Sequence, residues 1–301
     1  MIVAKAVSIS TLRATAFFAA TAIAISTLAG CNTGPSTGDA EALSFEGLEF
    51  PSNIDVDSAG NVFVTDWGHD RVVRLDDATN EQSEVPFRGL TDLASITVGS
   101  EGSVYVSEGE GTNSQGRILK MPAGGTSQEV LTTREHPGAL AVSDSGDIYF
   151  YDFGSPVIYK FIPETKSTEI EVALVHTNFP GFDQYFNDIA LGNDGKLVAI
   201  TGLPDPRILR VLSSQVLEEL PFLKGKERFP ISIDINKSGD MVILDGKLGD
   251  HILKVPNGST EPIELSFGEL NQPSDVAIDD SGNVYVADRN NHRVLKLQAN
   301  D

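Results

Sequence analysis

An internal repeat runs through most of this chain. PSNIDVDSAGNVFVTDWGHDRVVRL (residues 51–75) and PSDVAIDDSGNVYVADRNNHRVLKL (residues 273–297) have the same length and agree at most apolar positions, and four weaker copies lie between them. The copies share a turn glycine, found at Gly60, Gly102, Gly146, Gly195, Gly239 and Gly282. These glycines lie 42 to 49 residues apart. A repeat of about 40 to 50 residues with about four strands is typical of a β-propeller blade, so the sequence predicts six blades.

Each copy has the pattern of short β-strands. In the first copy NIDVD, VFVTD and RVVRL alternate apolar and polar residues and are separated by turn residues. The last copy ends after three such segments, whereas EALSFEGLEFPS (residues 41–52) resembles IELSFGELNQPS (residues 263–274), where a fourth strand belongs. We therefore expect residues 42–45 to complete the sixth blade and close the ring. The predicted fold is an all-β six-bladed propeller of four-stranded antiparallel blades over residues 41–299.

The first 30 residues have the composition of an export signal. Only Lys5 and Arg13 are charged there, and the stretch runs apolar through ATAFFAATAIAISTLAG to a small-residue end. This run is at the short end of what spans a bilayer, so we favour a cleaved signal over a retained membrane helix. LAGC (residues 28–31) resembles the lipobox of bacterial lipoproteins, and Cys31 is the only cysteine. We expect Cys31 to carry lipid, with a buried free thiol as the alternative, and residues 31–40 to form a flexible tether.

A lipid on Cys31 would hold the protein on the extracytoplasmic face of the cell membrane without spanning it. The chain has 43 acidic and 22 basic residues, a formal net charge of −21. This charge argues against a nucleic-acid partner, because phosphate backbones are bound by clustered Lys and Arg. We favour solubility as the reason for the acidic surface over a cationic partner, and we expect a monomer.

The copies, above all SDVAIDDSGNVYVADRNNHRVLKL, resemble NHL repeats. As a set they are similar to the six-bladed NHL propeller that forms the extracytoplasmic sensor domain of actinobacterial receptor Ser/Thr kinases. The similarity is strong in the first and sixth copies and weak in the fourth, where AITGLPDPRIL lacks the Asp of the others. Nothing in the chain resembles the glycine-rich loop of a kinase. The resemblance implies a propeller that binds or senses.

The last copy brings together an acid, a histidine and an arginine, the residue types of a proton-transfer site. The acid and the arginine recur at the same places in other copies, and a chemical site is needed once, not around a ring. We therefore interpret these residues as structural corners. We expect the acid to accept backbone N–H groups in the loop between the second and third strands, and the arginine to pair with an acid there or in a neighbouring blade. The corner residues are Asp66, Arg71, Asp245, Asp288, His292 and Arg293.

The long connection HTNFPGFDQYFND (residues 176–188) carries four aromatic residues. In propellers it belongs to the face formed by the loops from strand four to strand one and from strand two to strand three, and loops on rigid scaffolds commonly bind ligands. Exposed aromatic residues mark interaction surfaces, whereas buried ones would only pin the loop. We assign to a candidate ligand-binding face Trp67, Phe153, Phe179, Phe182, Tyr185, Phe186 and Arg289.

The starts of the first strands offer a weaker candidate site. Asn53, Asp188 and Asp275 should converge on the channel, where their oxygens could hold Ca²⁺, with a hydrated polar channel as the alternative. Gluconolactonase-like hydrolases are also six-bladed and bind a metal near this place, which implies a metal-dependent lactone or ester hydrolase as a second function. NHL-type lyases use channel histidines, but no first strand starts with one here, and His136 is isolated.

Binding without catalysis is the function that the sequence favours. The chain has no phosphate-binding loop, no G-x-S-x-G elbow, no paired-cysteine metal site and no H-E-x-x-H motif. We expect no cofactor, and we expect the ligand to be a protein, a peptide or an envelope glycan.

Overall fold

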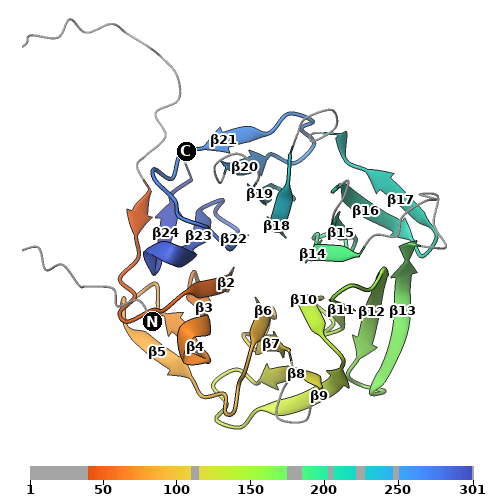
Figure 1. Ribbon diagram of the computed structural model, residues 1–301, viewed down its shortest axis with the longest axis horizontal. Helices are drawn as coiled ribbons and strands as arrows, with labels where there is room; N and C mark the ends of the chain where they lie inside the picture. Colours follow the sequence, from red (N-terminus) through yellow and green to blue (C-terminus); the bar gives the residue numbers. More distant parts are fainter. Residues whose placement is uncertain are drawn as a thin grey trace, which may run out of the picture. The chain divides into compact units, whose positions relative to one another are not determined.

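The protein is a six-bladed β-propeller. The computed structural model describes residues 40–109, 115–174, 185–202, 206–221, 228–246 and 251–299. The chain divides after Ser36, and every described residue belongs to the second unit, Thr37–Asp301. These residues form six four-stranded antiparallel sheets around a central channel (Figure 1). The predicted fold class is therefore confirmed, and no helix in the described ranges is long and apolar enough to cross a membrane.

Each blade is a meander that runs outward from the channel (Figure 1). The innermost strands of blades one to six are β2 (Pro51–Val56), β6 (Leu93–Val98), β10 (Pro137–Val142), β14 (Phe186–Leu191), β18 (Pro230–Ile235) and β22 (Asp275–Ile278). The second strands are β3 (Val62–Asp66), β7 (Val104–Glu108), β11 (Ile148–Asp152), β15 (Leu197–Thr201), β19 (Met241–Asp245) and β23 (Val284–Asp288). The third strands are β4 (Arg71–Leu75), β8 (Gly116–Met121), β12 (Val157–Ile162), β16 (Ile208–Ser213), β20 (His251–Val255) and β24 (Arg293–Leu297). The outermost strands are β5 (Gln82–Val85), β9 (Glu129–Arg134), β13 (Ser167–Ala173), β17 (Val216–Glu219), β21 (Ile263–Leu265) and β1 (Glu41–Ala42).

The N-terminal strand closes the ring, as the sequence predicts. β1 pairs antiparallel with β24 in the sixth blade, with Ala42 opposite Leu295. Leu43 extends the pairing by donating its N–H to the carbonyl of Val294 at 2.9 Å. The paired segment is shorter than the predicted residues 42–45, because Phe45 turns to pack against the apolar cluster between blades six and one.

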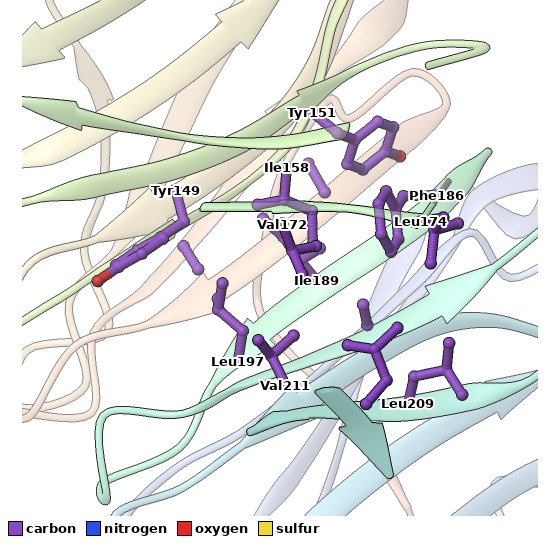
Figure 2. Close-up of a cluster of buried hydrophobic side chains, with 14 residues drawn as sticks. Tyr149, Tyr151, Ile158, Val172, Leu174, Phe186, Ile189, Leu197, Leu209 and Val211 are labelled. Carbon is purple, nitrogen blue, oxygen red and sulfur yellow. The ribbon is translucent and has the colours of Figure 1, made fainter. Parts of the chain in front are cut away.

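The apolar core is divided among the interfaces between neighbouring blades. The described residues form six buried clusters, and each joins two successive blades. In the cluster between blades three and four, Tyr151 and Leu174 of one blade lie close to Phe186 of the other (Figure 2). A blade has too little surface to bury alone, so each one is stabilised by its two neighbours.

The turn between the first and second strands depends on glycine. Gly60 has a φ of 85° and donates its N–H to the carbonyl of Asp57 at 3.0 Å. The five equivalent glycines have φ values between 73° and 86°. Side chains disfavour this left-handed region, which explains why glycine recurs in every copy.

Replacing Leu43 by proline should weaken ring closure. The substitution removes the N–H that pairs with Val294, and proline cannot donate within a sheet. We expect the free energy of unfolding to fall by about 1 kcal/mol or more, measured by urea denaturation. The control Glu41→Ala changes an exposed side chain and should leave the midpoint unchanged. Equal midpoints for Leu43→Pro and the wild type would contradict a closing role for this segment.

Candidate functional site

The acid that ends a second strand ties together separate segments of its blade. Asp288 accepts the N–H of Asn271 at 2.8 Å with Oδ1 and the Nε–H of Arg293 at 2.7 Å with Oδ2. Arg293 also donates through Nη2 to the carbonyl of Glu269 at 2.8 Å. Because Asp288 is fully buried, these donors replace the water that its charge loses on folding.

The corners of blades one and six each differ in one detail from the expectation based on the sequence. Asp66 binds Arg71 within its own blade at 2.8 Å, but its backbone donor is Glu49, at 2.6 Å, which precedes the first strand. The donor is therefore not in the loop between the second and third strands. His292 Nδ1 accepts the N–H of Phe50 in blade one at 3.2 Å, so it holds a neighbouring blade. These contacts are those of a structural corner.

Where a copy lacks the loop arginine, a cation from another segment reaches the acid. In blade five Arg228, which precedes β18, binds Asp245 at 2.9 Å. In blade three Arg134, at the end of β9 in blade two, binds Asp152 at 2.7 Å. The corner acid therefore keeps a cationic partner in both of these blades, although the loop arginine is missing.

The central channel is lined mainly by acidic and uncharged side chains. It has a volume of about 500 Å³. The carboxylates that line it are Asp55, Asp57, Asp144, Asp188, Asp234, Asp275, Asp279 and Asp280. Lys237 is the only basic residue among the described channel-lining residues, and it pairs with Asp280 at 2.6 Å. The channel wall therefore carries an excess of carboxyl groups.

Four of these carboxylates link neighbouring blades. Asp275 accepts the N–H of Val276 in its own strand and that of Ile54 in blade one, both at 2.9 Å. Three more aspartates bridge in this way to blades two, five and six, at 2.6 to 2.8 Å. They are Asp55, Asp188 and Asp234. These side chains satisfy inner-strand N–H groups that face the next blade.

This bonding does not fit the expected Ca²⁺ site. Asp188 and Asp275 each use both carboxylate oxygens for backbone N–H groups. The Oδ1 atom of Asn53 accepts the hydroxyl of Thr65 at 3.3 Å. Within the described ranges no group of three or more His, Cys, Asp or Glu is placed to hold a metal ion. Asn53, Asp188 and Asp275 share the channel wall without forming a ligand set.

Burial raises the pKa of the channel carboxyl groups. The surrounding protein disfavours the charged form and raises the pKa of Asp55 to about 8 and that of Asp275 to about 7, and the charge of Asp234 adds to both. Burial also raises the pKa of Asp188, where the charge of Asp275 adds, and the pKa of Asp234. The channel therefore holds protons near neutral pH that an exposed acidic surface would release.

On one face of the propeller the chain enters the first strand of each blade and leaves the second strand. Two sets of residues form this face. Backbone hydrogen bonds join the sets, as in Gly202 N–H to the carbonyl of Tyr185 and Phe153 N–H to the carbonyl of His136, both at 2.8 Å. The set that precedes the first strands is Phe50, Asp92, His136, Tyr185, Phe229 and Gln272. The set that follows the second strands is Trp67, Gly109, Phe153, Gly202, Gly246 and Arg289. We call these twelve residues the mouth face.

Trp67 and Phe153 are the exposed aromatic residues of the described chain, with 41% and 52% of their surface accessible. The other large exposed hydrophobic residues in the described ranges are aliphatic, and Val130 and Ile170, for example, lie in outermost strands. Aromatic rings combine a large apolar area with low side-chain entropy, and they are enriched where proteins bind. Among the described residues the exposed aromatic surface is thus restricted to the mouth face.

A cluster of rings lies across the seam between blades six and one. The guanidinium of Arg289 is 5.1 Å from the ring centroid of Trp67. The ring of Phe50 is 6.4 Å from that of Trp67 and 4.7 Å from that of His292. Phe50 has a φ of 55°, which is uncommon for a residue with a side chain. The structure brings together the predicted Trp67 and Arg289 and adds Phe50, whose signal in the sequence is its place directly before the first strand.

One aromatic residue of the predicted face is buried. Phe186 is the first residue of β14 and is fully buried, with its ring 6.3 Å from that of Tyr151 (Figure 2). It stabilises the interface between blades three and four and cannot contact a ligand. Tyr185 stays partly exposed on the mouth face. Phe179 and Phe182 lie outside the described residues.

Replacing Arg293 by alanine should leave the buried charge of Asp288 without its cation. We expect the free energy of unfolding to fall by about 2–4 kcal/mol, because the charge of Asp288 would then be buried without a cationic partner. Urea denaturation measures the change. Asn290→Ala, in the same loop, is the control and should shift stability by less than about 0.5 kcal/mol. An unchanged midpoint in Arg293→Ala would rule out the structural role of this corner.

The raised pKa values should make stability fall as the pH rises. Asp55 and Asp275 keep their protons in the folded protein up to about pH 8 and 7, whereas the unfolded chain releases them near pH 4. The contribution of these groups is thus complete below about pH 4 and is lost as the pH passes 7 to 8. We expect the melting temperature to decrease from about pH 5 to pH 9 and Asp55→Asn to flatten this slope, whatever its effect on the absolute value. The same slope in the variant would contradict the assignment.

Comparisons with known proteins agree with this architecture. Residues 270–297 match the NHL repeat family. No curated protein matches the sequence of this chain. Solved structures do match, at identities low enough that the likeness shows the fold alone.

Three of these structures show the range of proteins that share the fold. Virginiamycin B lyase from Staphylococcus aureus is 16% identical, with 87% of this chain and 88% of the lyase covered and a TM-score of 0.56. A gluconolactonase from Xanthomonas campestris is 13% identical, with 87% and 90% covered and a TM-score of 0.64. An auxiliary nutrient binding protein from Bacteroides thetaiotaomicron is 14% identical, with 83% and 69% covered and a TM-score of 0.61. The chain is thus a six-bladed propeller with an NHL repeat, similar in fold to both enzymes and binding proteins.

Proposed function

We propose that this protein is a binding propeller without catalysis, which recognises a protein, a peptide or an envelope glycan on its mouth face. The observation that carries the proposal is the restriction of exposed aromatic side chains, Trp67 and Phe153, to that face in the described chain. The other large exposed hydrophobic residues of the described segments are aliphatic and are not part of this face. A rigid scaffold that presents aromatic residues on loop ends is suited to recognition.

The acidic and basic groups of the described residues support binding over catalysis. The corner acids Asp66 and Asp288 are paired with arginines and backbone N–H groups. The channel acids link one inner strand to the next. These contacts hold segments of the fold together, which supports a structural role for these acids over a role as general base.

The lipid anchor is part of the same proposal. The export signal and the lipobox around Cys31 favour a protein held by lipid on the extracytoplasmic face of the cell membrane, acting as a monomer. A location in the envelope suits a binding partner that is an envelope component, and the resemblance to receptor-kinase sensor propellers suits a sensor or scaffold role.

A metal-dependent hydrolase of lactones or esters has less support. Its expected ligands, Asn53, Asp188 and Asp275, already hold hydrogen bonds within the protein. Similarity in fold to a gluconolactonase at 13% identity carries no activity to this chain.

Capture of a partner by wild-type and variant proteins tests the mouth face. The protein would be cross-linked in envelope extracts and its partners identified by mass spectrometry, with Trp67→Ser/Phe153→Ser as the test variant. We expect a partner captured by the wild type to be reduced at least about tenfold in the variant, because truncated aromatic anchors typically cost more than 1 kcal/mol of binding.

The matched control is Val130→Ser/Ile170→Ser. These residues are 53% and 64% exposed, so the control removes similar exposed apolar area from the outer strands. Capture that survives in the mouth-face variant, or is lost equally in the control, would refute the proposal.

A further inference from the structure

The corner of blade three differs from other buried corners at one atom. In blades one, two, five and six, one carboxylate oxygen accepts a backbone N–H from the segment that enters the first strand. In blade three the Oδ1 atom of Asp152 is buried and has no hydrogen-bond partner among the described residues. Its Oδ2 atom accepts both Nε–H and Nη2–H of Arg134, at 3.1 and 2.7 Å. A buried acceptor without a donor is unfavourable and points to a donor from outside the protein.

Asp152 borders a cavity of about 520 Å³ at the mouth face. This volume lies within the range of small-molecule sites. Phe153 lines both this cavity and the central channel, so it separates the two. Glu135 and His136 are exposed on the cavity wall. The cavity therefore extends the proposed binding face over blade three.

The groups around the cavity are held in place by rings. The guanidinium of Arg134 lies 4.2 Å from the ring centroid of Tyr159, while it also binds Asp152. The ring of Phe153 meets that of Tyr151 edge-on, with centroids 5.7 Å apart and an interplanar angle of 85°. An exposed ring and a fixed acid–arginine pair thus lie next to each other, and their positions are set before a ligand arrives.

The local charges define the class of ligand. Arg134 and Asp152 neutralise each other, so the pair favours neither a cation nor an anion, and the exposed Glu135 on the wall disfavours an anion. The free acceptor requires a hydrogen-bond donor, and rotation about the soft χ2 torsion of an aspartate can present either oxygen to the cavity. The remaining wall includes the uncharged polar residues Gln115, Thr133 and Ser155. A neutral molecule with several hydroxyl groups and a flat C–H face matches the free acceptor, the exposed ring of Phe153 and the uncharged polar groups.

We propose that this cavity is a subsite for a neutral saccharide, which donates a hydroxyl hydrogen bond to Asp152 and stacks its ring on Phe153. The inference rests on the proposed function, because it narrows the ligand class of the mouth face. Trp67, in blade one, is not part of this subsite.

Titration calorimetry with the purified protein tests the subsite. The probes are neutral disaccharides of glucose, galactose, mannose and N-acetylglucosamine, with glucuronic acid and glucosamine as charged counterparts. We expect at least one neutral disaccharide to bind, and Phe153→Ala and Asp152→Asn each to weaken it about tenfold or more. Phe153→Tyr should keep the affinity, and Val216→Ser, at an exposed position of the outermost strand β17, should change it less than about twofold. Phe153 is exposed, so its substitution preserves the fold even if Asp152→Asn lowers the melting temperature.

Three results would overturn the inference. The first is that no neutral disaccharide binds, which would leave solvent as the donor to Asp152. The second is tighter binding of a charged counterpart. The third is binding that is lost in Trp67→Ala but kept in Phe153→Ala, which would refute the subsite while supporting the mouth face. If the mouth face binds no partner at all, the capture experiment shows this independently of the calorimetry.

Discussion

Each blade of this propeller buries its apolar faces only against the two neighbouring blades. The six clusters of the described chain all lie at interfaces between blades. An open row of such blades would leave one apolar face exposed at each end, so the fold depends on closure. β1 pairs with β24, Leu48 and Ile54 pack against Tyr285, and Asp275 bonds to Ile54 at the same seam. The channel, the corners and the mouth face take their positions from this closed ring.

Buried carboxylates are stabilised in two different ways in this protein. At the corners an arginine compensates the charge, and where the repeat lacks it, Arg134 or Arg228 reaches in from another segment. Among the described channel-lining residues Lys237 is the one cation, and it pairs with Asp280. There the carboxyl groups of Asp55 and Asp275 retain protons instead, as their raised pKa values indicate. Aspartate therefore links segments of this fold in two ways. At the corners it is an anion paired with a cation, and in the channel it is a carboxyl group that titrates near neutral pH.

The repeat pattern predicts the features that all copies share, but it does not predict contacts between residues of different copies. The six blades, the turn glycines and the closing strand follow from the period of the sequence and from local backbone chemistry. In blades one, two, three and six a basic residue of the third strand lies over an aromatic ring of the second strand, as with Lys296 over Tyr285 at 5.3 Å. Arg134 could not be assigned to Asp152 because the two belong to different copies. Phe186 was placed on the surface because a long loop hides where β14 begins.

The seam also determines how the propeller responds to tension. β1 is only two residues long and is the first strand of the described chain, yet it is the outermost strand of the last blade. A load applied to the chain on the N-terminal side of Glu41 therefore enters the ring through β1 and Leu43, before it reaches any blade built from a continuous segment. Peeling this segment away would expose the edge of β24 and loosen the cluster to which Leu43 and Phe45 contribute. The segment that completes the ring is thus also the place where a pull from the N-terminal side begins to open it.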